Sequence, residues 1–82
     1  MKHAGPAALD RLEPLLAEVR ALADLKEKSR GVFYRRSKAF LHFHEDPTGL
    51  YADIRNTAGD FDRFRVETPQ ERAQFLAHAR SI

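Results

Sequence analysis

The alternation of apolar and polar residues between Val32 and Ile54 is the sequence feature that most constrains the fold. β-branched and aromatic residues alternate there with polar ones, and a period of two is typical of strands with one buried face. Two segments with turn chemistry interrupt the alternation, Arg36-Ser37 and Asp46-Pro47-Thr48-Gly49. In the second, proline presets the backbone φ angle and glycine tolerates a left-handed one. The pattern therefore predicts antiparallel strands joined by hairpins.

The two turns also predict which residues share a face of the sheet, because successive side chains of a strand point to opposite faces. The face expected to be buried comprises Val32, Tyr34, Ala39, Leu41, Phe43, Ala52 and Ile54. The opposite face comprises Phe33, Arg35, Lys38, Phe40, His42, His44, Tyr51, Asp53 and Arg55. A slip of one residue in either hairpin would mix the two sets, so the apolar character of the first set supports this register.

Helical patterns flank the predicted strands. Apolar residues recur at helical spacing over about residues 7–23, although Pro14 either kinks this helix or lies in its first ordered turn. A further strand is expected over Asp62–Val66, and Thr68-Pro69-Gln70-Glu71 has the pattern of a capping box that opens a second helix. We therefore expect an α+β fold: an N-terminal helix, a four-stranded antiparallel meander and a C-terminal helix, with both helices packed on the apolar sheet face.

Length and composition limit the classes of function. At 82 residues without cysteine, the chain is expected to form a single domain over residues 1–82, with residues 1–6 flexible, and to lack disulfides and thiolate metal sites. No apolar run resembles a membrane span or a secretory signal, so we expect a cytoplasmic protein with no membrane partner. The chain shows no complete catalytic constellation and no glycine-rich phosphate loop. An enzyme is therefore the less favoured class, and we predict no catalytic residue and no cofactor.

One stretch carries a resemblance to known proteins. Residues Phe33–Asp46 and Gly49–Arg55 resemble a family of small uncharacterised bacterial proteins. More distantly, the order helix, meander, helix over about residues 9–78 is similar to that of the MmcQ/YjbR-like domains. The resemblance implies an α+β fold and includes no catalytic motif.

His42 and His44 are the candidate metal ligands. Residues two apart on a strand point the same way, and the register places Asp53 opposite His42, so two histidines and a carboxylate could converge on one ion. The same pair could serve as general acid and base in a small hydrolytic protein. No third histidine lies nearby in the sequence, so ordinary cross-strand pairs are the simpler interpretation. His3 and His78 are expected to be solvated.

The distribution of charge suggests a second kind of site. Residues 26–38 hold six cations and one acid, whereas residues 45–72 hold seven acids and four bases. With Arg55, Arg63 and Arg65, the first group could surround aromatic residues of the sheet, and basic surfaces with exposed aromatics bind single-stranded nucleic acids. The net charge of only +2 weighs against this reading, and charged residues also protect sheet edges from aggregation. Nucleic-acid binding is therefore one alternative.

Phe33 and Phe40 lead to the preferred prediction. In the expected register they face each other on the exposed side, and together with Tyr51 they form an apolar patch. A monomer would expose this patch to solvent unless its first helix or N-terminal tail covered it. Association with a second copy or another protein would cover the patch. We therefore predict a non-enzymatic interaction module, a homodimer through the exposed sheet face, with nucleic-acid binding and a metal-binding or hydrolytic protein as the alternatives.

Overall fold

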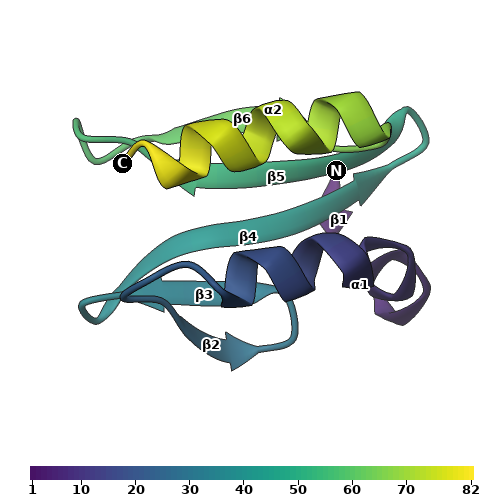
Figure 1. Cartoon of the computed structure of the whole chain (residues 1–82). Helices are drawn as coiled ribbons and strands as arrows, with labels where there is room; N and C mark the ends of the chain where they lie inside the picture. The colour runs from purple at the N-terminus through teal and green to yellow at the C-terminus, as the bar shows by residue number, and fades with distance from the viewer.

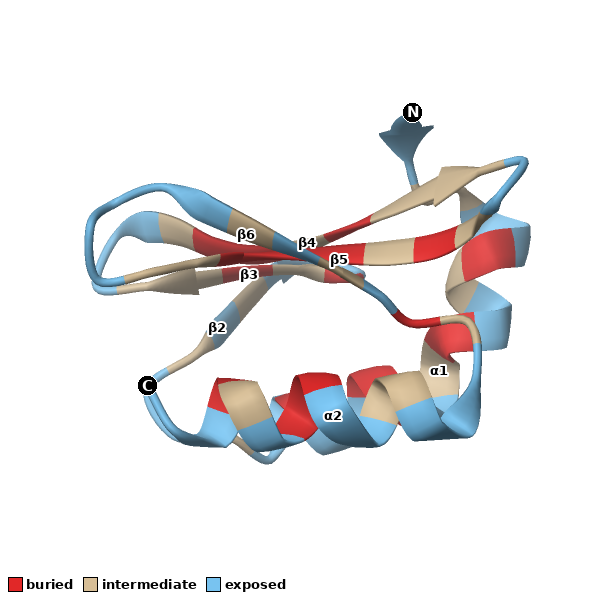
Figure 2. Cartoon of the chain, turned by 90° about the horizontal axis from the view of Figure 1, so that it is seen from above, coloured by how far each residue is buried: buried red, intermediate tan, exposed pale blue.

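Two helices and a six-stranded antiparallel sheet make up the computed structural model, which describes residues 1–82 (Figure 1). In chain order the elements are β1 (Lys2–His3), α1 (Pro6–Arg20), β2 (Lys26–Ser29), β3 (Val32–Arg35), β4 (Lys38–Asp46), β5 (Gly49–Arg55), β6 (Phe61–Arg65) and α2 (Pro69–Arg80). Strands β2 to β6 follow one another across the sheet, and β1 pairs with β4. Both helices lie on one side of the sheet (Figure 2), and we call the other side the open face. The predicted α+β class is confirmed.

The expected number of four strands is wrong. Periodicity does not detect β2 because Lys26–Ser29 contains no apolar residue, and its lysines are typical of an exposed sheet edge. Strand β1 has only two residues, which is too short for any period. It pairs with the far end of β4, where Lys2 lies opposite Glu45 and His3 opposite His44. The expected flexibility of residues 1–6 stays a prediction.

The first hairpin turns at Arg36-Ser37 as predicted, and both residues adopt the left-handed backbone that two-residue hairpin loops require, with φ of 52° and 70°. Beyond the first two pairs the expected register is wrong. A bulge inserts Phe40, so Phe33 lies opposite Leu41 rather than opposite Phe40. Phe33 and Phe40 are therefore buried, at 1% and 5% exposure, and do not form an exposed patch. The bulge places three bulky apolar side chains in the core, which an unbroken alternation would have divided between core and water.

The second hairpin has the predicted register throughout, with Leu41 opposite Ile54 and His42 opposite Asp53. The expected burial of Val32, Tyr34 and Ala39 is only partial. The expected strand before α2 is β6, and it leads into Val66, which is fully buried. The buried core joins this sheet face to the two helices and comprises Ala8, Leu12, Leu15, Leu16, Val19, Phe33, Phe40, Leu41, Phe43, Leu50, Ala52, Ile54, Val66, Phe75, Leu76 and Ala79.

Each helix begins as its sequence suggests. The capping box of α2 is confirmed, because Thr68 Oγ1 accepts a hydrogen bond from Glu71 N and the Glu71 carboxylate accepts one from Thr68 N. Helix α1 continues through Pro14, which lies on its exposed side, and ends at Arg20 rather than near residue 23. The Gly5 N–H before α1 donates to Glu45 Oε2 at 2.6 Å. This bond ties the start of α1 to the same end of β4 that holds β1.

Candidate functional site

The nine residues predicted to share one binding face occupy three places in the structure. Phe33 and Phe40 belong to the core, as described above. Strand alternation leaves His42, His44, Tyr51 and Asp53 on the open face, because Leu41, Phe43 and Ala52 between them are buried against the helices. Arg35, Lys38 and Arg55 line a pocket at one end of the sheet. The structure therefore offers two candidate sites: a histidine cluster and a basic pocket.

The histidine cluster contains three imidazoles. His42 Nδ1 lies 2.9 Å from His44 Nε2, and the His3 ring lies 4.7 Å from the His44 ring and 5.7 Å from the His42 ring. Each of the three side chains has a ring nitrogen within 4.8 Å of ring nitrogens on both others. The expectation that His3 is merely solvated is wrong in one respect, since β1 brings it against His44, although its side chain is exposed. Sequence alone misses this residue because a two-residue strand leaves no periodic signal.

Asp53 is the carboxylate beneath the cluster. It is only 7% exposed and accepts two hydrogen bonds from Arg63, at 2.7 and 2.8 Å. Burial alone would raise the pKa of Asp53, but the hydrogen bonds and charge of Arg63 bring that pKa below its ordinary value. His44 Nε2 lies 3.2 Å from Asp53 Oδ2. Asp53, predicted as a third metal ligand beside His42 and His44, thus has both oxygens in contact with neighbouring side chains.

The contact with Asp53 assigns the tautomer of the neutral His44 ring. An ionised carboxylate accepts hydrogen bonds only, so Nε2 of His44 carries the proton and His42 Nδ1 accepts from the same N–H. In the neutral ring the Nδ1 atom then keeps a lone pair, and this atom is buried without a hydrogen-bond partner. Burial lowers the pKa of both His42 and His44, which favours the neutral form of each ring near pH 7.

His78, the fourth histidine, lies elsewhere. It is half-buried, and its ring lies against that of Phe64 in a tilted arrangement with the two centroids 4.8 Å apart. The expectation that His78 is solvated is therefore wrong. Helix α2 faces the core on this side, and the imidazole completes the apolar contact between β6 and α2. His78 is remote from the histidine cluster because α2 and the open face lie on opposite sides of the sheet (Figure 2).

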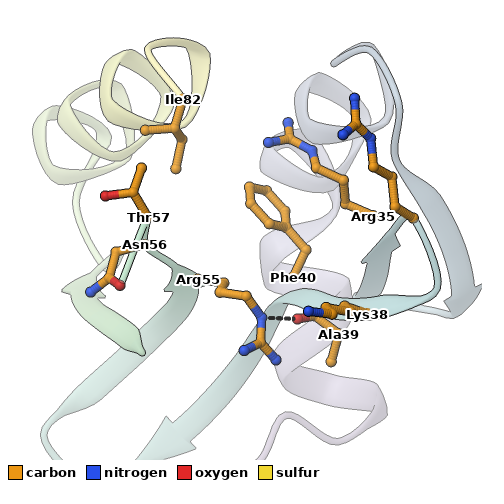
Figure 3. A pocket seen from close by; sticks show the side chains of 9 residues that line it. Arg35, Lys38, Ala39, Phe40, Arg55, Asn56, Thr57 and Ile82 are labelled. Carbon is orange, nitrogen blue, oxygen red and sulfur yellow. Dashed lines mark hydrogen bonds between the residues drawn. The ribbon is translucent and has the colours of Figure 1, made fainter. Parts of the chain in front are cut away.

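The basic pocket lies between the β3–β4 hairpin, the end of β5 and the chain segment after α2 (Figure 3). Its volume is about 370 Å³, and it is lined by Arg35, Arg36, Lys38, Ala39, Phe40, Arg55, Asn56, Thr57 and Ile82. The lining includes four cations and no carboxylate side chain. Arg55 donates to the Ala39 carbonyl at 2.7 Å, which fixes the position of its guanidinium group at the rim.

Arg35 is a half-buried cation of this pocket. Its guanidinium lies over the Phe40 ring, 4.1 Å from the ring centroid. Its Nε atom is buried and has no hydrogen-bond partner. A buried guanidinium nitrogen without an acceptor is unfavourable, because burial removes the water that would otherwise bind it. Arg35 can therefore gain a hydrogen bond and a counter-charge from an anionic ligand.

Ion pairing divides the cations of the molecule into two groups. Seven side chains each have a carboxylate partner: Lys2, Arg11, Arg20, Arg30, Arg63, Arg65 and Arg80. Arg72 instead donates to backbone carbonyls. Six cations have no carboxylate partner and gather where β3 and β5 end and β2 and β4 begin: Lys26, Lys28, Arg35, Arg36, Lys38 and Arg55. We call this group the basic end.

A second pocket extends the basic end beyond the first. It is lined by Asp24, Leu25, Lys26, Lys28, Tyr34, Arg36 and Ser37. Arg36 lines both pockets, so they are neighbours on either side of the hairpin turn. Tyr34 is half-buried here, and Lys28 Nζ lies 5.2 Å from the centre of its ring. Five of the six cations predicted from residues 26–38 are therefore brought together. The sixth, Arg30, is paired with Asp10 and Glu13. Arg63 and Arg65 are likewise paired, with Asp53 and Glu71.

Comparison of the chain with protein-family models, curated proteins and solved structures finds no match. The resemblance to MmcQ/YjbR-like domains therefore stays a prediction. No helix of the structure is long and apolar enough to span a membrane.

Proposed function

We propose that the protein is a non-enzymatic module that binds single-stranded nucleic acid at the basic end. The observation that carries the proposal is the separation of the cations: the six at the basic end lack carboxylate partners, while seven others are ion-paired. Cations free of internal partners keep their attraction for an external anion. The small net charge of +2 does not oppose this reading, because most of the acids are paired with cations outside the basic end.

The shape of the basic end favours an extended polyanion over a small anion. Two pockets lie side by side around Arg36, and cations line both. A chain of phosphates can contact both pockets at once, whereas a single phosphate fills one. Tyr34 lines the second pocket and is half-buried, so part of its ring is exposed for stacking, whereas the Phe40 ring in the first pocket is buried beneath the Arg35 guanidinium. Cationic grooves with aromatic surfaces for base stacking are the common means of binding single strands.

Binding is favoured over catalysis by the composition of the first pocket. Its lining contains neither a histidine nor a carboxylate side chain that could act as a general base on Thr57 or on water. Self-association, the prediction preferred from the sequence, depended on an exposed patch of Phe33 and Phe40. Both side chains are buried, so that argument is lost. Dimerisation stays a prediction that sedimentation of the same samples tests.

Fluorescence anisotropy with labelled oligothymidylate and oligouridylate tests the proposal. Each oligonucleotide has about 12 nucleotides, a length within the range that small single-strand binding domains cover. The test variant is Arg36→Asn with Lys38→Gln, since asparagine tolerates the left-handed backbone of residue 36. We expect affinity at low salt to fall at least about tenfold. The slope of log affinity against log salt should become shallower by about 1.4, the change expected for two lost phosphate contacts on a single strand.

The control variant is Arg11→Gln with Arg80→Gln, which removes the same charge from exposed ion pairs with Glu67 and Glu18. Its affinity and salt slope should remain within about twofold of the parent protein, because both cations already have counter-charges. No binding to either oligonucleotide at low ionic strength would refute the proposal. Equal losses of affinity in the two double variants would show that binding responds to net charge alone, and this result would also refute the proposal.

A further inference from the structure

We propose that His3, His42 and His44 form a binding site for a divalent transition metal ion of the zinc, nickel or copper class, and that the bound ion fastens β1 to the open face. This site is independent of the basic end and goes beyond the proposed function. Imidazole nitrogen is a preferred ligand of these ions. Three protein ligands and one open position also make a common coordination sphere for zinc.

The backbone already directs the three rings toward one point. His42 and His44 are two residues apart on β4 and share the open face, and His3 is the cross-strand neighbour of His44 on β1. The ring nitrogens lie within 4.8 Å of one another. Nitrogens bound to one tetrahedral zinc ion at ordinary bond lengths are about 3.4 Å apart, so the widest separation among the three has to close by only about 1.4 Å. His3 can supply this movement because its side chain is exposed.

Neighbouring side chains hold the His44 ring in the way that is common for histidine metal ligands. Histidine ligands commonly donate their other ring N–H to a carboxylate, which fixes the tautomer and the ring orientation. His44 makes this contact with Asp53, and Arg63 in turn holds Asp53 with two hydrogen bonds. The remaining Nδ1 atom of His44 is buried and has no partner. A metal ion bound there would satisfy its lone pair.

The arrangement also distinguishes ligands from supporting groups. Arg63 bonds to both carboxylate oxygens of Asp53, so coordination of the ion by Asp53 would require that pair to loosen. Coordination by the three imidazoles leaves that charged pair intact and breaks, where His42 binds through Nδ1, only the hydrogen bond between the His42 and His44 rings. The His42 ring also lies 4.9 Å from the ring of Phe61. The ligand set is therefore three histidines, with Asp53 and Arg63 as positioning residues.

Isothermal titration of the full, tag-free chain with Zn²⁺, Ni²⁺ and Cu²⁺ tests the site. We expect one ion per chain for at least one metal. The His3→Ala substitution should weaken the affinity more than about tenfold, because even the loss of a group that only hydrogen-bonds to a metal ligand has an effect of that size. His3 is exposed, so its substitution should leave the fold intact, and circular dichroism checks this. His78→Ala is the control and should bind as the parent does, because His78 belongs to α2, which lies on the opposite side of the sheet from the open face.

Two further measurements complete the test. In NMR spectra, saturating Zn²⁺ should shift the ring resonances of His3, His42 and His44 and leave those of His78 unchanged. Metal at about 100 times the dissociation constant should raise the melting temperature of the parent by about 10 °C or more and that of His3→Ala much less. No binding at 100 µM of any of the three metals would overturn the inference. Equal binding by His3→Ala and the parent would overturn it as well.

Discussion

Truncation of Phe33 distinguishes a core residue from an interface residue. Phe33 is 1% exposed and packs in the buried core, opposite Leu41. Removal of a buried phenylalanine ring in Phe33→Ala should lower the free energy of unfolding by about 3–5 kcal/mol, because the lost burial and the residual cavity add. A domain of 82 residues has a total stability of only about 4–12 kcal/mol. The melting temperature should therefore fall by about 12 °C or more.

Urea unfolding followed by circular dichroism measures this loss, and Phe61→Ala is the matched control. Phe61 is 38% exposed and contacts the His42 ring and the Arg55 guanidinium, so its truncation should lower stability by about 1 kcal/mol or less. If Phe33→Ala is unfolded at all urea concentrations, Phe33→Leu retains most of the volume and should lower stability by about 1 kcal/mol. A Phe33→Ala protein as stable as Phe61→Ala, with a changed sedimentation mass, would refute the bulged register and return Phe33 to an interface.

Three further predictions concern the cap, the surface charges and a glycine. Thr68→Ala should lower stability by about 1 kcal/mol in thermal melts, because Glu71 N loses its side-chain acceptor; an unchanged melting temperature would contradict the capping role. The pKa of Glu13 is lowered from 4.5 to about 2 by hydrogen bonds from Arg20 and Arg30, so its contribution to stability is complete above about pH 4.5 and lost as the pH falls through 2. An NMR titration should show this midpoint and a higher one in Arg30→Met, and a Glu13 midpoint near 4.5 in the parent would refute the network. Gly31→Ala should destabilise the protein more than a typical surface substitution, because φ at this position is +81° and the new Cβ would lie 2.7 Å from a Leu9 methyl group. Chemical denaturation measures this change in stability, and a stabilised variant would contradict the prediction.

The parts of the structure that the sequence predicts are those with strong local signals. The Asp46–Gly49 turn and the alternation on both sides of it predict every pair of β4 and β5. The capping box at Thr68 likewise predicts the start of α2. The bulge at Phe40 is different, because it arises from the gain in burying Phe33, Phe40 and Leu41 together, and a register extended from a turn does not include that energy.

Local sequence patterns predict the candidate sites only in part. The basic end is predictable in large part, since five of its six cations lie within residues 26–38. Their freedom from ion pairs is not, because it depends on where distant acids such as Glu71 and Asp53 lie. His3 joins His42 and His44 only through the pairing of β1 with β4, a contact between residues 41 positions apart along the chain. No local pattern reports such a contact.

The Arg36-Ser37 turn bears on how this protein could be engineered. Both residues have positive φ, a conformation that costs free energy for residues other than glycine, asparagine and aspartate. A protein engineer seeking thermal stability would replace them with Asn-Gly, the sequence that such turns favour. That replacement would also remove the cation shared by the two pockets. Libraries screened for heat resistance alone should therefore enrich variants that have a more rigid hairpin and a lower affinity for polyanions.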